Sequence, residues 1–162
     1  GIQMIFIILG SQKFQFNRLL KAVDDLIESG VITEEVFAQV GYSDYIPRNF
    51  KCEKFFDRKE LSDFIHKADI IITHGGSGSI VGAVKSRKKT IAVPRKAQYN
   101  EHVDDHQIQI IQQFTRQNLI CACEDCEQLE AALDMVRKTE YESYQSNTED
   151  IINSIRNFID NN

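Results

Sequence analysis

Two spacings of apolar residues alternate along the chain almost from end to end. Short apolar runs, typical of strands buried on both faces of a parallel sheet, are separated by segments in which apolar residues recur at helical spacing. Strands are expected at residues 5–9, 36–40, 52–56, 68–73, 90–93 and 119–123. Strands that alternate with helices predict right-handed crossovers. The expected fold is therefore α/β and Rossmann-like, a parallel sheet with helices on both faces.

Residue types at the helix ends support these boundaries. Gly30 stands where the C-terminal cap of the first helix, residues 16–27, belongs. Asp57 can cap the next helix, and Asp125 with Gln128 three residues later resembles a capping box. The remaining helices are expected at residues 78–87, 104–117, 129–136 and, after a polar linker at 138–147, at 148–160.

Composition and charge narrow the class of protein. Of 162 residues, 42% are hydrophobic and 27% charged, which is too apolar for a disordered chain. A net charge of -5 argues against a nucleic-acid binder, whose affinity comes from neutralising phosphates with basic side chains. We expect residues 1–162 to form a single domain that holds any anionic ligand by local geometry.

The sequence shows neither a membrane-span pattern nor an export signal. Its longest wholly apolar run, residues 4–9, is far shorter than the roughly 20 residues that cross a bilayer, and no signal-peptide pattern surrounds it. Four cysteines are too few for a disulfide scaffold of this length, so reduced thiols are expected. These features predict a cytoplasmic protein.

The strongest chemical signal is the sequence HGGSGS at residues 74–79, which lies between a buried strand and a helix. Glycine lets the backbone approach a ligand, and the first turn of a helix presents unpaired N–H groups and the positive end of its dipole. This arrangement suits a phosphate or diphosphate. The alternative is a tight turn that binds nothing, because glycine also simply marks turns.

Loops that follow neighbouring strands should adjoin this turn. In a doubly wound sheet, ligands bind beyond the carboxyl ends of the strands, which brings in the loops at residues 10–13 and 95–106. Arg95 directly follows a strand and is a candidate partner for the anion. The chain has no P-loop and no dinucleotide fingerprint. An esterase elbow around Ser77 fails because Ser79 stands where glycine is required.

A second polar cluster, residues 100–107, leads into the helix expected from residue 104. Asp104 and Asp105 suit the positive helix start, while Glu101, His106 and Gln107 offer hydrogen bonds to sugar hydroxyls. The alternative is a solvated first turn, which is common in helices.

Two further clusters raise the question of a metal. His102 and His106 are spaced i,i+4 with acids between them, but they do not match HExxH. Cys121, Cys123 and Cys126 lack a second pair at zinc-finger spacing and are interpreted as buried or free thiols. No metal or other cofactor is expected.

In combination, these motifs resemble the carboxyl-terminal, donor-binding half of GT-B glycosyltransferases of family 28. The nearest resemblance is to small bacterial subunits of exopolysaccharide or capsule synthesis, often called PssE-like or EpsF-like. A more distant one is to the soluble subunit of the eukaryotic two-part N-acetylglucosaminyltransferase that acts on dolichol-linked GlcNAc. The motifs that carry the resemblance are Ile8-Leu9-Gly10-Ser11-Gln12, Gln39-Val40-Gly41-Tyr42-Ser43-Asp44-Tyr45, residues 68–80, Val93-Pro94-Arg95 and Glu101-His102-Val103-Asp104-Asp105-His106-Gln107.

The resemblance implies roles for individual residues. The residues implied to bind the donor diphosphate are Gly10, Ser11, Gln12, His74, Gly75, Gly76, Ser77, Gly78, Ser79 and Arg95. Those implied to contact the donor sugar or ribose are Glu101, His102, Asp105, His106 and Gln107. One departure concerns the ribose, because many relatives carry a glutamate near the position of Gly82. Glu101 is the candidate substitute for it.

Sugar transfer needs a donor site and an acceptor site in a water-poor cleft, which GT-B enzymes build between two domains. With elements for one domain only, this chain is expected to be the donor-binding subunit of a two-component inverting glycosyltransferase. The resemblance implies transfer of a hexose from a UDP-sugar to a lipid-linked acceptor in exopolysaccharide or capsule synthesis. It also implies a membrane-associated partner that binds the acceptor, holds the chain at the inner face of the membrane and supplies the catalytic base.

Two alternatives to this function belong to other classes. One is a non-catalytic module that binds a nucleotide sugar and stimulates a partner transferase. The other is a self-contained enzyme acting on nucleotide sugars, such as an epimerase or hydrolase.

Overall fold

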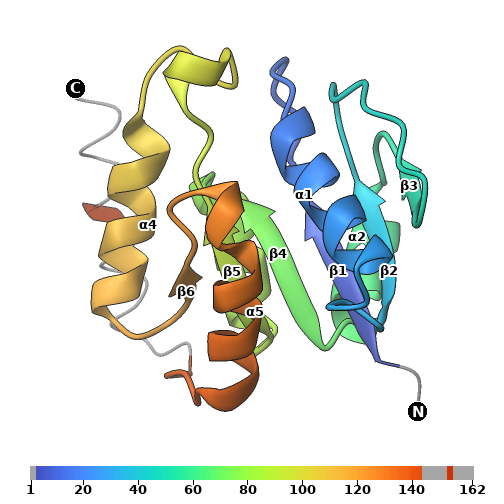
Figure 1. Ribbon diagram of the computed structural model, residues 1–162. Helices are drawn as coiled ribbons and strands as arrows, with labels where there is room; N and C mark the ends of the chain where they lie inside the picture. Colours follow the sequence, from blue (N-terminus) through green and yellow to red (C-terminus); the bar gives the residue numbers. More distant parts are fainter. Residues whose placement is uncertain (1–2, 144–152, 155–162) are drawn as a thin grey trace.

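Six parallel strands form the sheet around which the chain is built (Figure 1). The computed structural model describes residues 3–143 and 153–154. The strands lie in the order β3-β2-β1-β4-β5-β6, and every neighbouring pair is parallel. Their bounds are β1 Met4–Ile8, β2 Glu35–Gln39, β3 Lys51–Glu53, β4 Ile70–His74, β5 Lys89–Val93 and β6 Cys121–Ala122. This arrangement confirms the predicted fold class.

Helices cover both faces of the sheet. Their bounds are α1 Asn17–Glu28, α2 Arg58–Lys67, α3 Ser77–Lys85, α4 His106–Arg116 and α5 Leu129–Lys138, with short 3-10 turns η1 Ala97–Tyr99 and η2 Cys126–Gln128. Side chains alternate along each strand, so Ile5 and Ile7 of β1 pack with α1 and α5, whereas Phe6 and Ile8 lie in the layer with α2 and α3. α4 and α3 share a third apolar cluster with Ala92 of β5.

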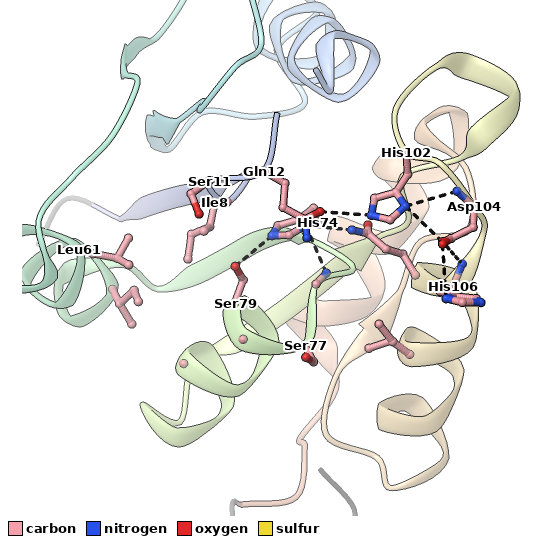
Figure 2. Close-up of a pocket in the computed structure, with 17 residues that line it drawn as sticks. Ile8, Ser11, Gln12, Leu61, His74, Ser77, Ser79, His102, Asp104 and His106 are labelled. Atoms are coloured by element: carbon pink, nitrogen blue, oxygen red, sulfur yellow. Dashed lines mark hydrogen bonds and ion pairs between the residues drawn. The ribbon is translucent and has the colours of Figure 1, made fainter. Parts of the chain in front are cut away.

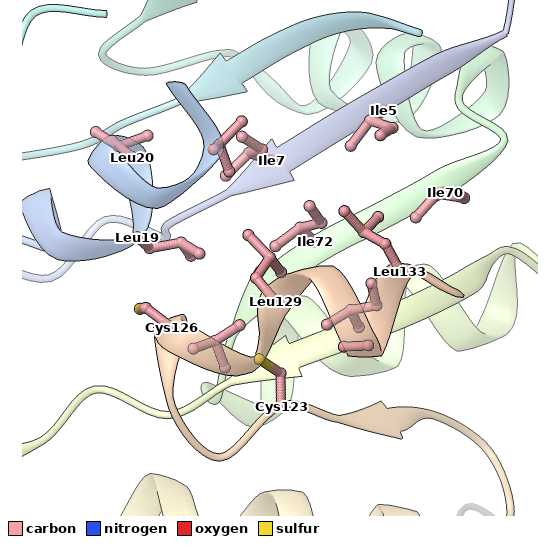
Figure 3. Packing of buried hydrophobic residues seen from close by; sticks show 14 of the residues in the cluster. Ile5, Ile7, Leu19, Leu20, Ile70, Ile72, Cys123, Cys126, Leu129 and Leu133 are labelled. Atoms are coloured by element: carbon pink, nitrogen blue, oxygen red, sulfur yellow. The ribbon is translucent and has the colours of Figure 1, made fainter. Parts of the chain in front are cut away.

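Three cysteines belong to the larger apolar layer, part of which Figure 3 shows. Cys121, Cys123 and Cys126 are buried there, and all four cysteines of the chain are free thiols. Burial raises the pKa of both Cys123 and Cys126 to about 12, which keeps these two thiols protonated and unreactive at neutral pH. The prediction of buried thiols is confirmed for this cluster.

Two of the expected helix caps form and one does not. Asp57 accepts a hydrogen bond from the Glu60 N–H at 2.8 Å, and Gly30 adopts a left-handed φ of +83° just after α1. The predicted capping box is wrong, because the Asp125 carboxylate accepts from Nη1 of Arg18 at 2.8 Å and caps no N–H group. A guanidinium within reach is a stronger donor to a carboxylate than a backbone N–H.

Several elements are shorter than predicted. β3 has three residues and β6 two. Both are edge strands with a neighbour on one side only, so apolar residues beyond them continue without sheet pairing. α4 begins at residue 106 rather than 104, because the Asp104 carboxylate instead accepts the N–H of His106.

The expected linker is packed on the domain as far as the structure describes it. The Glu142 N–H donates to the Asn118 carbonyl at 2.9 Å, and Tyr141 packs against the larger apolar layer. The helix predicted at residues 148–160 lies outside the described residues, apart from residues 153–154. None of the helices in the described ranges has the length and apolar character needed to cross a bilayer.

A buried carboxylate holds the loop that follows β2. Asp24 of α1 is fully buried and accepts hydrogen bonds from the Tyr45 hydroxyl (2.7 Å) and from the N–H groups of Arg48 (2.8 Å) and Asn49 (3.0 Å). Burial by itself raises the pKa of Asp24, but these hydrogen bonds outweigh it and bring the pKa below its usual value. The carboxylate therefore stabilises the fold in its ionised form.

We expect Asp24→Asn to lower the free energy of unfolding by about 2 kcal/mol at pH 7, because the neutral amide cannot replace a charged acceptor of three hydrogen bonds. A group with a depressed folded pKa stabilises the fold above its unfolded pKa, and this stabilisation is lost as the pH falls through the folded value. The difference between wild type and variant should shrink below about pH 4. Urea unfolding of the wild type and of Asp24→Asn, from pH 7 down to below about pH 4, measures this difference in the free energy of unfolding. Exposed Asp25→Asn is the matched control, and equal losses from both substitutions contradict the assigned role.

Candidate functional site

A cavity of about 530 Å³ opens where β1 and β4 end, between α2, α3 and α4 (Figure 2). Figure 2 shows Leu61 on one side of it and His106 on the other, with Ser77 and Ser79 of α3 between them. The lining residues are Ile8, Gly10, Ser11, Gln12, Leu61, Ile65, His74, Gly76, Ser77, Gly78, Ser79, Gly82, His102, Asp104, His106, Gln107 and Ile110. Most residues that the sequence predicts for the site therefore meet at one cavity. The predicted residues outside its wall are Gly75, Arg95, Glu101 and Asp105.

The first turn of α3 presents backbone donors to the cavity. Gly76 precedes the helix in an extended conformation, and no side chain caps the helix. Within the described part of the chain, the N–H groups of Ser77, Gly78 and Ser79 have no hydrogen-bond partner. Such donors, at the positive end of a helix, bind an anion without a basic side chain. The geometry suits a phosphate group.

The glycines here are needed for packing as well as for approach of a ligand. A Cβ on Gly76 would lie 2.3 Å from Cε1 of His74, and a Cβ on Gly75 would lie 2.7 Å from Cβ of Gln107. Gly10, with a left-handed φ of +78°, contacts the same imidazole from the end of β1. By contrast, a Cβ on Gly78 would meet no atom within 4 Å, so this position faces open cavity.

A buried amide to which the sequence analysis assigns no individual role shapes the adjoining wall. Gln39, at the end of β2, accepts a hydrogen bond from the Gly10 N–H at 2.9 Å and donates to the carbonyls of Gly10 (2.9 Å) and Lys54 (2.8 Å). These bonds fix the backbone that carries Ser11 and Gln12. In the sequence, the feature that could have identified Gln39 is its place as a polar residue at the end of an apolar strand.

The imidazole of His74 lies at the centre of the site and is 5% exposed. Its Nδ1 is 2.9 Å from Nη1 of Arg95, and its Nε2 is 3.0 Å from the Ser79 hydroxyl. Burial, the Arg95 guanidinium and the nearby His102 together lower the pKa of His74 to about 3. The ring is neutral at physiological pH, so His74 acts through hydrogen bonds rather than as a cation.

Gln107 lines the cavity, yet most of its amide is used within the protein. Oε1 accepts from the N–H groups of Gly75 (2.9 Å) and Arg95 (3.0 Å), and Nε2 lies 3.2 Å from Nδ1 of His74. These bonds tie α4 to the ends of β4 and β5. The side chain can offer a sugar hydroxyl only its remaining amide N–H.

Arg95 and Glu101 are directed into the protein rather than toward the cavity, and Asp105 is exposed but lies outside the cavity wall. Arg95 is 1% exposed, and Glu101, also 1% exposed, forms a two-bond pair with Arg18 at 3.0 and 3.1 Å. Asp105 accepts a hydrogen bond from the Ala97 N–H at 3.0 Å. The burial of Arg95 and Glu101 corrects the expectation that their side chains contact the donor directly, including Glu101 as the ribose partner. The buried polar atoms of Arg95 and Glu101 are not available to a ligand in the cavity.

Two histidines flank Asp104 on the polar wall. Nδ1 of His102 lies 3.2 Å from Oδ1 of Asp104, and Nδ1 of His106 lies 3.5 Å from Oδ2. His102 also packs on Phe14, with ring centroids 5.0 Å apart, and reaches Oε1 of Gln12 at 3.2 Å. The side chains of Asp104 and His106 are about one third exposed, 36% and 31%, so both can hydrogen-bond a ligand. Among the described residues, no group of three or more His, Cys, Asp or Glu is arranged to hold a metal ion.

The opposite wall is apolar, a feature that the sequence analysis does not predict. Leu61 and Ile65 of α2 line it together with Ile8 of β1. Gly82 adds no side chain, and a Cβ there would meet no atom within 4 Å. The helical spacing of Leu61 and Ile65 predicts burial but not exposure to a ligand cavity. An apolar wall facing a polar one suits a ligand with a ring at one end and hydroxyls at the other.

The fold has a counterpart among known families. The profile of the glycosyltransferase family 28 C-terminal domain matches residues 4–161. The chain belongs to this family. Its six-stranded parallel sheet with covering helices matches the C-terminal domains of GT-B glycosyltransferases, which confirms the resemblance at the level of the fold.

Several individual proteins are similar to this family 28 domain. Over 58 residues it is 34% identical to the UDP-N-acetylglucosamine transferase subunit ALG13 of Candida albicans, over 36% of this chain and 18% of that protein. The solution structure of ALG13 has a TM-score of 0.59 at 19% identity, over 88% of this chain and 89% of that one. MurG of Acinetobacter baumannii has a TM-score of 0.57 at 17% identity, over 97% of this chain and 51% of that one. The chain thus spans about half of MurG and less of the Candida protein.

We expect Gly76→Ala and Gly78→Ala to have opposite effects on the free energy of unfolding. The Cβ of the first would collide with the pinned imidazole of His74, at a cost of roughly 1–3 kcal/mol. The second replaces a helix glycine in open space and should stabilise the fold by up to about 1 kcal/mol. Urea unfolding of both variants measures the difference. A Gly76→Ala variant as stable as the wild type would show that the imidazole is not packed as described.

Proposed function

We propose that this chain is the donor-binding subunit of a two-component inverting glycosyltransferase that uses a UDP-sugar. The observation that carries the proposal is the first turn of α3. Its residues Ser77, Gly78 and Ser79 line the cavity, and within the described residues their N–H groups have no hydrogen-bond partner. These donors match the charge and size of a diphosphate. Membership of the family 28 C-terminal domain supports the same function.

The two unlike walls support a nucleotide sugar as the ligand. With the diphosphate at the start of α3, the nucleoside lies against the apolar wall of Leu61 and Ile65, and the hexose lies beside Asp104 and His106. The volume of about 530 Å³ falls within the range of roughly 300–1,000 Å³ that is usual for small-molecule sites.

In this proposal the reaction is a displacement at the anomeric carbon. The oxygen of the acceptor hydroxyl attacks this carbon from the face opposite UDP, while the bond from the carbon to the β-phosphate oxygen breaks. The electron pair goes to the departing diphosphate, where the N–H groups of Ser77 and Gly78 stabilise the growing charge. The hydroxyl proton passes to a base that we place on the partner.

We assign the acceptor site to a membrane-associated partner subunit. A transfer cleft needs a second wall to exclude water. The Candida relative is itself described as a transferase subunit. The acceptor in this proposal is lipid-linked, the product is exopolysaccharide or capsule, and the chain works in the cytoplasm at the inner face of the membrane.

Calorimetric titration with UDP, GDP and UDP-hexoses tests the donor site. We expect the wild type to prefer UDP to GDP, and Gly78→Leu to weaken UDP binding by about 100-fold or more, because the new side chain fills the cavity at the first turn of α3. Gly78→Ala, which leaves most of that space open, is the matched control. A wild-type chain that binds no UDP, or a Gly78→Leu variant with unchanged affinity, contradicts the proposal.

The position of the hexose has a separate test. We expect His106→Ala to weaken binding of the UDP-hexose that the wild type prefers by roughly threefold to tenfold, which is the effect of one lost hydrogen bond. The affinity for UDP itself should stay within about twofold of the wild-type value. Gln109→Ala, on an exposed part of α4, is the control and should change neither. If His106→Ala weakened UDP and UDP-hexose equally, the sugar would not lie against this wall.

A further inference from the structure

Three donors converge on one ring nitrogen of His74. Nδ1 lies 2.9 Å from Nη1 of Arg95, 3.2 Å from the Gly76 nitrogen and 3.2 Å from Nε2 of Gln107. A guanidinium has donors only and keeps its protons in proteins. Nδ1 must therefore be the unprotonated nitrogen of the neutral ring, and the ring hydrogen is on Nε2.

The tautomer decides what the neighbouring hydroxyl offers to a ligand. With hydrogen on Nε2, His74 donates to Oγ of Ser79 across 3.0 Å, and the hydroxyl hydrogen of Ser79 is free to point into the cavity that Ser79 lines. In the other tautomer, Nε2 would accept that hydrogen, and Ser79 would turn its lone pairs toward the ligand. Only the first arrangement adds a donor beside the unpaired N–H groups of α3.

The shortest of the three contacts to Nδ1 comes from a buried cation, Arg95, which has no carboxylate partner among the described residues. Arg95 is 1% exposed and is held by the Phe14 carbonyl (3.2 Å from Nη2) and by the Phe16 ring (5.4 Å from Cζ). Its Nε has no hydrogen-bond partner among the described residues. Glu101, the acid whose charge acts on it, is bonded to Arg18 instead. Burying such a charge is costly unless an anion compensates for it.

We propose that Arg95 is a positioning residue of the diphosphate site, which acts through His74 to make the Ser79 hydroxyl a hydrogen-bond donor. Its positive charge lies behind the imidazole, on the side away from the cavity, and favours an anion in front of it. This inference rests on the proposed function, because it assigns the charge to the same diphosphate that α3 binds. It also explains why an arginine at a strand end is buried rather than turned to the ligand.

The tautomer is read directly from ¹H–¹⁵N spectra of the unliganded, ¹⁵N-labelled chain. We expect the His74 ring to show hydrogen on Nε2 and a pyridine-type Nδ1 in the wild type. Arg95→Lys, which keeps a charged donor, should retain this signature. Arg95→Met, of similar length, leaves Nδ1 with the two longer contacts from Gly76 and Gln107 and should mix the two tautomers. A wild-type ring with hydrogen on Nδ1 overturns the proposal.

Binding of UDP to the wild type and to four variants measures the coupling between Ser79 and Arg95. We expect Ser79→Ala to weaken binding about tenfold in the wild type, and Arg95→Met to weaken it by at least as much. In the Arg95→Met background, Ser79→Ala should weaken binding clearly less than in the wild type, because the Ser79 hydroxyl then donates in only part of the molecules. Arg95→Lys should recover most of the affinity. Equal effects of Ser79→Ala in both backgrounds overturn the proposal, as does equal binding by the Lys and Met variants, which would indicate a packing role alone.

Two controls keep the outcome decisive. If Arg95→Met does not fold, the wild-type spectrum and Ser79→Ala still decide, since undiminished UDP binding by Ser79→Ala overturns the inference. Inorganic pyrophosphate as a second probe separates the inference from the proposed function. A chain that binds pyrophosphate with the same dependence on Ser79 and Arg95, but not UDP, contradicts the proposed function and supports the inference. A chain that binds neither contradicts both.

Discussion

The geometry of the site depends on the close packing of one imidazole against glycine backbone. A Cβ on Gly76 would come within 2.3 Å of the His74 ring, and a Cβ on Gly10 within 2.7 Å. The end of β1, the end of β4 and the first turn of α3 all touch this ring, so their positions are set together. Protein interiors packed at this density do not yield to one added methyl group without a shift of the neighbours. The α3 donors are thereby held at one fixed distance from the loops after β1 and β5.

The electrostatic potential in the cavity comes from the N–H dipoles at the start of α3 and from one buried charge, that of Arg95. The described residues that line it include no lysine or arginine, and the chain as a whole is negative, at -5. An anion is instead met by unpaired N–H groups at a helix start, which need no reorganisation when the ligand binds. Arg95 adds its charge from behind a neutral imidazole. Such a site favours a diphosphate through the placement of donors, and it does not attract polyanions at long range.

Much of the polar sequence around the site orients loops rather than ligands. Gln39 bonds both backbone groups of Gly10, Gln107 joins α4 to two strand ends, and Asp24 holds the loop after β2. Glu101 and Arg18 do the same for the loop after β5. Loops that are already ordered lose little conformational entropy when a ligand binds, so the entropic cost of binding is smaller. The partly exposed groups that remain, Asp104 and His106 above all, are the ones free to recognise a sugar.

The order of strands and helices, the glycine-rich turn and the helix that follows it were readable from the sequence, because apolar periodicity and glycine act locally. The same local rules placed the caps at Asp57 and Gly30. They failed for Asp125 because its partner, Arg18, is distant in the chain. Only the tertiary structure decided which way Arg95, Glu101 and Gln107 face, since each is oriented by contacts with residues from other elements. The apolar wall was likewise undetermined by sequence, because helical spacing says that Leu61 is covered but not whether protein or ligand covers it.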